Sequence, residues 1–98
     1  MRFSYRVYES GGDRLLAIAD ANIIGKTLDG GALRMEVKES FYSGSACSEL
    51  EAKSLVAKAT IINAVGKGIV SLMAREGLVN KQTVLDIGGV PHAQVVRI

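Results

Sequence analysis

The sequence is poor in the residue types that mark several classes of protein. Its 98 residues include one cysteine, Cys47, and no tryptophan. A single cysteine excludes an internal disulfide framework and a zinc site built from the cysteines of one chain, and it is typical of a reducing compartment. One histidine and scattered carboxylates form no metal-binding pattern, so we expect no metal or other cofactor. Aromatic residues make up only 5% of the chain, and the core must therefore be aliphatic.

Long apolar runs and a strong net charge are also missing. The sequence MRFSYRVYES has no apolar stretch that could serve as a signal peptide, and the most apolar stretch, residues 57–74, is broken by lysine, asparagine and glycine. We therefore expect a cytoplasmic protein that does not enter the membrane. The net charge is +2, and residues 51–98 alone carry +3. That surplus permits an RNA partner without demanding one.

What the chain does contain is clear hydrophobic periodicity. Residues 2–9 and 14–20 have the pattern of strands, and the sequence SGGD before the second predicts the turn of a β-hairpin. Residues 31–40 alternate, which predicts an antiparallel strand with Leu33 and Val37 on its buried face and Arg34 on its wet face. Two closing strands are predicted over residues 81–87 and 92–98.

Helical spacing begins at Ser48. Ser48 and Glu51 have the spacing of a capping box, and apolar residues at helical intervals continue to Gly77, a typical residue beyond a helix C-terminus. Gly66 and Gly68 lie inside this stretch, which therefore forms one helix or two. The prediction is a single domain, residues 1–98, of the α+β class, with a mainly antiparallel sheet and one or two helices packed on one face.

Two groups of basic residues have the composition of an RNA contact. Arg2 and Arg6 alternate with aromatic residues in the first strand, where bases could stack, although an edge strand with solvated arginines has the same pattern. Lys53 and Lys67 are fourteen residues apart, close to four helical turns, and are predicted to share a helix face as phosphate contacts. Lys26 lies in IIGKTL, which matches only the tail of a phosphate-binding loop and precedes no helix, so such a loop is excluded.

The remaining candidates are polar residues of the second half. Asn63 lies within the apolar helical stretch, one turn before Gly66, where it either caps a break between two helices or lines a site. Pro91 is expected to enter the last strand, because it cannot donate to a ladder, and His92 and Gln94 then share one face. His92 either bonds a nearby backbone carbonyl or presents a ring nitrogen to a ligand. We assign no catalytic residue.

Four segments of the chain together resemble a known family: LLAIAD with IIGKTL, GGALRMEVKESFYSG, ATIINAVGKGIVSLMAREGLV and GGVPHAQVVRI. The family consists of small archaeal proteins, catalogued as a domain of unknown function, number four-two-four, and labelled predicted RNA-binding. The similarity extends over nearly the whole chain, and GVPHAQVVR is its most specific part. The resemblance implies an archaeal cytosolic protein but no reaction. The positions that match its motifs include Gly25, Lys26, Asn63, Gly66, Pro91, His92 and Gln94.

Three classes of function remain open. The first is a module that binds RNA or a ribonucleoprotein in translation or RNA processing, which the family label, the basic second half and the Arg/Tyr strand favour. The second is a small enzyme or ligand-binding protein whose site gathers Asn63, Lys26 and His92. The third is a homo-oligomer that associates through the sheet edge. We favour the first.

Overall fold

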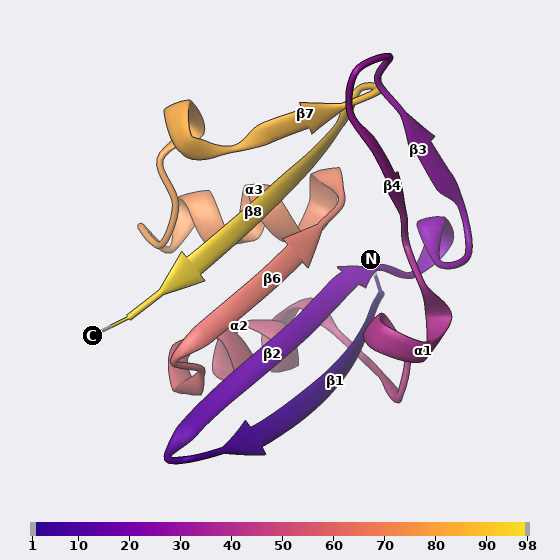
Figure 1. The fold of residues 1–98 in the computed structure, drawn as a ribbon. Coiled ribbons are helices and arrows are strands. Elements are labelled where there is room, and N and C mark those ends of the chain that lie inside the picture. Colours follow the sequence, from indigo (N-terminus) through magenta and orange to yellow (C-terminus); the bar gives the residue numbers. More distant parts are fainter. Residues whose placement is uncertain (1, 98) are drawn as a thin grey trace.

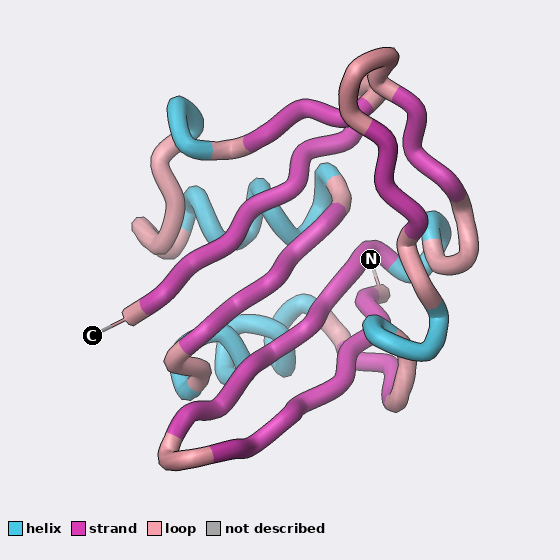
Figure 2. Tube along the Cα trace, viewed as in Figure 1, coloured by secondary structure: helices cyan, strands magenta, loops and turns pink. Residues whose placement is uncertain are grey.

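The structure, a computed structural model, describes residues 2–97 (Figures 1 and 2). In chain order, its elements are β1 (Phe3–Ser10), β2 (Asp13–Asp20), the 3-10 helix η1 (Ala21–Ile23), β3 (Thr27–Asp29), β4 (Arg34–Glu36), α1 (Glu39–Tyr42), β5 (Ser45–Cys47), α2 (Glu49–Lys58), β6 (Ile61–Val65), α3 (Lys67–Arg75), the 3-10 helix η2 (Lys81–Thr83), β7 (Leu85–Ile87) and β8 (Val90–Val96). None of the described helices has the length and apolarity that crossing a membrane requires.

The main sheet has six strands in the order β5-β1-β2-β6-β8-β7. Among the described strands, β2 and β6 alone pair in parallel, and the other neighbours in this sheet are antiparallel. A second sheet consists of the short hairpin β3–β4. The α+β class with a mainly antiparallel sheet is therefore confirmed.

The two faces of the main sheet are covered differently. Helices α2 and α3 lie behind the sheet in Figure 1, and a hydrophobic cluster that includes Leu16, Ile62 and Ile69 fills the space between them. On the opposite face, α1 and the β3–β4 hairpin cover a second cluster, which includes Ala17 and Tyr42. The predicted helical layer on one face is confirmed, and the second layer is an addition that the sequence did not indicate.

The prediction of one or two helices between Ser48 and Gly77 holds for two helices, α2 and α3, but is wrong for the residues between them. The capping box is present, and α2 begins at Glu49, but it ends at Lys58, and β6 then enters the centre of the sheet. The strand was misread because a central strand is apolar on both faces and lacks alternation. Ile62 packs in the helix-side cluster and Val65 in the other one.

Because residues 61–65 form a strand, two groups of candidate residues lie on other elements than predicted. Asn63 lies on a strand and not on a helix. Lys53 lies on α2 and Lys67 on α3, so the fourteen-residue spacing does not place them on one helix face. Helix α3 does end as predicted: Gly77 has a φ of 74°, and its amide donates to Ala74 while that of Leu78 donates to Met73, the pattern of a Schellman motif.

The predicted strand over residues 31–40 is shorter than expected, and one of its core assignments is wrong. β4 covers only Arg34–Glu36, and Leu33 is 46% exposed, whereas Val37 is fully buried. Leu33 belongs to the hairpin turn, where its carbonyl accepts from the amide of Gly30. Residues of the turn lie beyond the edge of the sheet that would bury them. The apolar and polar residues of the sequence therefore alternate over a longer stretch than the strand itself covers.

The hairpin β3–β4 is held at its far end by contact between two turns. A Cβ atom on Gly88, in the β7–β8 turn, would lie 2.5 Å from the carbonyl oxygen of Asp29. A Cβ atom on Gly30 would in turn lie 2.9 Å from the amide nitrogen of Gly88. The two turns therefore approach backbone to backbone, which only glycine permits at these positions.

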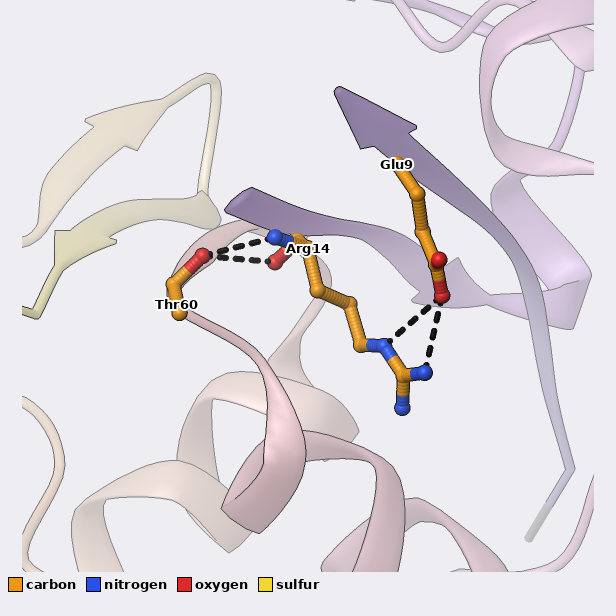
Figure 3. Close-up of polar contacts among 3 residues, drawn as sticks. All are labelled: Glu9, Arg14 and Thr60. Carbon is orange, nitrogen blue, oxygen red and sulfur yellow. Dashed lines mark hydrogen bonds and ion pairs between the residues drawn. The ribbon is translucent and has the colours of Figure 1, made fainter. Parts of the chain in front are cut away.

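The parallel pair β2–β6 is joined at its starting end by Thr60 and Arg14 (Figure 3). The Arg14 amide donates to Thr60 Oγ1 at 2.8 Å, and the Thr60 amide donates to the Arg14 carbonyl at 2.9 Å. The Arg14 guanidinium also contacts Glu9 Oε1 at 2.8 Å, but this pair is solvated and contributes little stability. The backbone bonds fix the register in which β6 follows β2.

We predict that Gly88→Ala destabilises the protein considerably more than Gly89→Ala. Both glycines have positive φ, 62° and 88°, so each alanine costs about 1–2 kcal/mol of left-handed strain. At Gly88 the new Cβ also meets the Asp29 carbonyl, whereas at Gly89 nothing lies within 4 Å. Urea denaturation of the two variants measures the difference, and equal losses would contradict the turn-to-turn contact.

Candidate functional site

Part of the second face of the main sheet has no layer over it. α1 packs over β1 and β2, and the β3–β4 hairpin covers the end of the sheet near Ile87 and Val90, whereas Val96 on β8 and Leu85 on β7 are 68% and 52% exposed. We call the uncovered surface of β6, β8 and β7 the open face. Figure 2 shows these strands in front, with α2 and α3 behind them.

The register of β6 and β8 brings three predicted site residues together on the open face. Asn63 lies directly opposite Gln94, and Val65 lies opposite His92. Alternate residues of a strand share a face, so His92 and Gln94 both lie beside Asn63. Ala93 and Val95 alternate with these residues on β8, and their side chains pack toward the helices on the opposite face of the sheet. Pro91 is the second residue of β8, and the turn before it is formed by Gly88 and Gly89.

A hydrogen-bonded group of three side chains forms the buried side of this site. The Tyr42 hydroxyl donates to Asn63 Oδ1 at 2.5 Å, and His92 Nε2 lies 3.2 Å from the same oxygen. Because that oxygen can only accept, His92 is the donor, and its neutral ring carries the proton on Nε2. We call Tyr42, Asn63 and His92 the polar triad. It links α1, β6 and β8.

The outer atoms of the polar triad are not fully buried. Within the described part of the chain, every fully buried side-chain nitrogen or oxygen has a hydrogen-bond partner. Asn63 Nδ2 and His92 Nδ1 make no hydrogen bond to residues 2–97, so neither atom is fully buried. The site therefore presents a donor on Asn63 and an acceptor on His92, with the exposed amide of Gln94 beside them.

Burial keeps the two titratable members of the triad uncharged near neutral pH. It raises the pKa of Tyr42 to about 12, and it lowers the pKa of His92 below the usual histidine value. The site can therefore offer neutral hydrogen-bonding groups and no fixed charge of its own.

The basic candidates do not converge on the triad. Arg6 is on the same face of the sheet, but its guanidinium donates to the Ser43 carbonyl at 2.9 Å, just beyond α1. Arg2 and Lys26 are exposed, before β1 and β3 respectively, and neither makes a hydrogen bond or ion pair with the triad in the described structure. Lys53 and Lys67 belong to the helical layer on the other side of the sheet.

Gly66 has a packing role at the start of α3. The buried Asp20 carboxylate accepts from the amides of Gly68 and Ile69 at 2.8 and 2.9 Å, which caps the helix from the end of β2. Gly66 has a φ of 124°, and a Cβ there would lie 2.4 Å from Asp20 Cγ. The Asp20 carboxylate thus occupies the place that an anion would take at this helix terminus.

Sequence reasoning missed Tyr42. It lies in a four-residue helix, and its contact with Asn63 joins positions twenty-one residues apart, so no local spacing indicates it. Cys47 is no part of the site: it packs in the helix-side cluster, and burial and the nearby Glu51 raise its pKa to about 11. Residues 2–97 contain no group of three or more His, Cys, Asp or Glu side chains suited to a metal ion.

Comparison with known proteins identifies the family. A family model described as "Protein of unknown function (DUF424)" matches residues 8–98. The chain belongs to this family. A crystal structure of an uncharacterized conserved protein from Methanopyrus kandleri has the same fold, with a TM-score of 0.79, 26% sequence identity, and coverage of 100% of this chain and 96% of that one. No curated protein matches the chain significantly. Membership of the DUF424 family assigns no activity.

We predict that acidification lowers the free energy of unfolding of this DUF424 protein, through the buried neutral ring of His92. Between the lowered pKa of folded His92 and the usual value of 6.5, the unfolded chain binds a proton that the folded chain does not, so the free energy of unfolding falls as pH falls. Urea denaturation at about pH 7.5 and about pH 5.5 measures the loss, which should be smaller in His92→Gln. His92 is the sole histidine, and an equal loss in both proteins would contradict its burial as a neutral ring.

Proposed function

We propose that this protein is an RNA-binding module that recognises unpaired bases on its open face. The observation that carries the proposal is the fixed donor on Asn63 next to the fixed acceptor on His92, with the Gln94 amide directly across from Asn63. Proteins read single-stranded RNA by hydrogen bonds to base edges, and an open sheet is a common platform for it. Neutral donors and acceptors suit a base edge, whereas phosphate is bound chiefly by cations.

A second feature, on the covered part of the same face of the sheet, supports RNA as the partner. Arg6, Ala17, Asn63 and Gln94 form a cross-strand row, so the exposed Arg6 lies three strand spacings, about 14 Å, from Gln94. A cationic side chain thus lies in the same cross-strand row as the base-reading groups, with the covered Ala17 between them, and two or three nucleotides would span that length.

Fluorescence anisotropy with short single-stranded RNA tests the proposal. We expect His92→Ala and Gln94→Ala to weaken binding by about five- to 150-fold each, because each removes a base contact worth about 1–3 kcal/mol. Arg6→Glu should weaken binding and also reduce its salt dependence between about 50 and 200 mM, because it removes a phosphate contact. His92→Ala should cost only about 1 kcal/mol of stability, because its triad bond is one ordinary hydrogen bond.

Lys53→Glu is the matched control for these variants. Lys53 is exposed on α2, behind the sheet, where a short oligonucleotide on the open face does not reach it. Lys53 and Lys67 can contact phosphate only in an RNA long enough to pass around the sheet. Failure of the wild-type protein to bind any unstructured RNA would refute the proposal, and so would an equal effect of Lys53→Glu and His92→Ala.

A second candidate function is self-association through the open face. The observation that favours it is the exposure of Val96 and Leu85 on a surface whose other side chains, Asn63, His92 and Gln94, are uncharged near neutral pH. Such a surface can pair with a second copy of itself without like-charge repulsion. Light scattering during gel filtration should then give twice the monomer mass, and Val96→Glu should restore the monomer. A wild-type monomer at high concentration would exclude this candidate.

A further inference from the structure

The orientation of the Asn63 amide decides what the open face presents. An asparagine side chain has an accepting end and a donating end, and rotation by half a turn exchanges them. With Oδ1 toward the triad, the amide group NH2 faces solvent, and the donating Nε2 of His92 leaves Nδ1 as an outward acceptor. With the amide reversed, Nδ2 would donate to His92 Nε2, and the ring proton would move to Nδ1. The outward group of Asn63 would then be an acceptor, and the outward nitrogen of His92 would be a donor.

The Tyr42 hydroxyl selects between these two states. Tyr42 is 2% exposed, and its hydroxyl proton finds its acceptor in Asn63 Oδ1. A reversed amide would leave the hydroxyl proton buried without an acceptor, which is the costly arrangement for a polar group.

We infer that Tyr42 is a positioning residue that locks the Asn63 amide and the His92 tautomer. It thereby sets which outward atom of the open face donates a hydrogen bond and which accepts one, an arrangement that we call the polarity of the open face. The inference rests on the proposed function for its consequence, because polarity matters only if the face reads a ligand. The class of ligand that fits is a nucleobase edge that places an acceptor opposite Asn63 Nδ2 and a donor opposite His92 Nδ1.

The ring nitrogens of His92 report the polarity directly, without RNA. We expect nitrogen-detected NMR of the wild-type protein, above the pKa of His92, to show the tautomer protonated on Nε2. Tyr42→Phe keeps the aromatic ring in the core and removes only the hydroxyl, so the variant should stay folded, which its amide spectrum checks. A measurable fraction of the tautomer protonated on Nδ1 should then appear.

Tyr8→Phe is the matched control for that measurement. Tyr8 belongs to the same aromatic cluster, but its hydroxyl donates to the Phe41 carbonyl at 2.9 Å and not to Asn63. This variant should leave the His92 tautomer unchanged. A wild-type ring protonated on Nδ1, or a tautomer that Tyr42→Phe leaves unaltered, would overturn the inference.

Decamers of adenosine, cytidine and uridine then test the consequence for recognition. The ratio between the tightest and weakest dissociation constants should fall about five- to tenfold in Tyr42→Phe, since both polarities become available to the ligand. It should stay the same in Tyr8→Phe. A changed tautomer with unchanged selectivity would overturn the specificity role. A locked tautomer in a protein that binds none of the decamers would refute the proposed function and leave the role of Tyr42 in the triad supported.

Discussion

Strand β6 pairs with β2 in parallel on one side and with β8 in antiparallel on the other, and both the layers and the site depend on this double pairing. A parallel neighbour must be reached by a crossover, and here the crossover comprises residues 21–60. It passes over one face as η1, the β3–β4 hairpin and α1, adds β5 at the sheet edge, and returns across the other face as α2. One connection thus supplies cover for both faces of the sheet.

The same crossover explains why polar groups lie at the border of an apolar cluster. Ala17 and Ala19 on β2 are fully buried in the cluster that contains Tyr42, and their short side chains leave room for an aromatic ring over the sheet. The Tyr42 ring lies in this cluster, and its hydroxyl reaches Asn63 on the next strand. A buried hydroxyl needs an acceptor, and Asn63 provides one at the point where the covering layer ends. The polar triad is therefore the boundary between the covered and the open part of the face.

The parts of this arrangement that follow local rules could be predicted from the sequence. The capping box at Ser48, the glycine end of α3 and the first hairpin are short-range patterns, and the structure contains all three. The common face of His92 and Gln94 also follows from the period of a strand. β6 could not be recognised, because burial on both faces leaves no alternation to distinguish it from a helix. Tyr42 could not be assigned to the site, because tertiary packing alone brings it to Asn63.

The chemistry of the open face fits the recognition role that we propose. A catalytic histidine works beside a nucleophile or a polarising charge, and its pKa lies near the working pH. Burial lowers the pKa of His92, and one of its two nitrogens is committed to Asn63. The thiol of Cys47 lies in the cluster on the other side of the sheet, and burial keeps it protonated near neutral pH. A neutral imidazole with one accepting nitrogen, held next to a fixed amide, is well suited to distinguish one hydrogen-bonding edge from another.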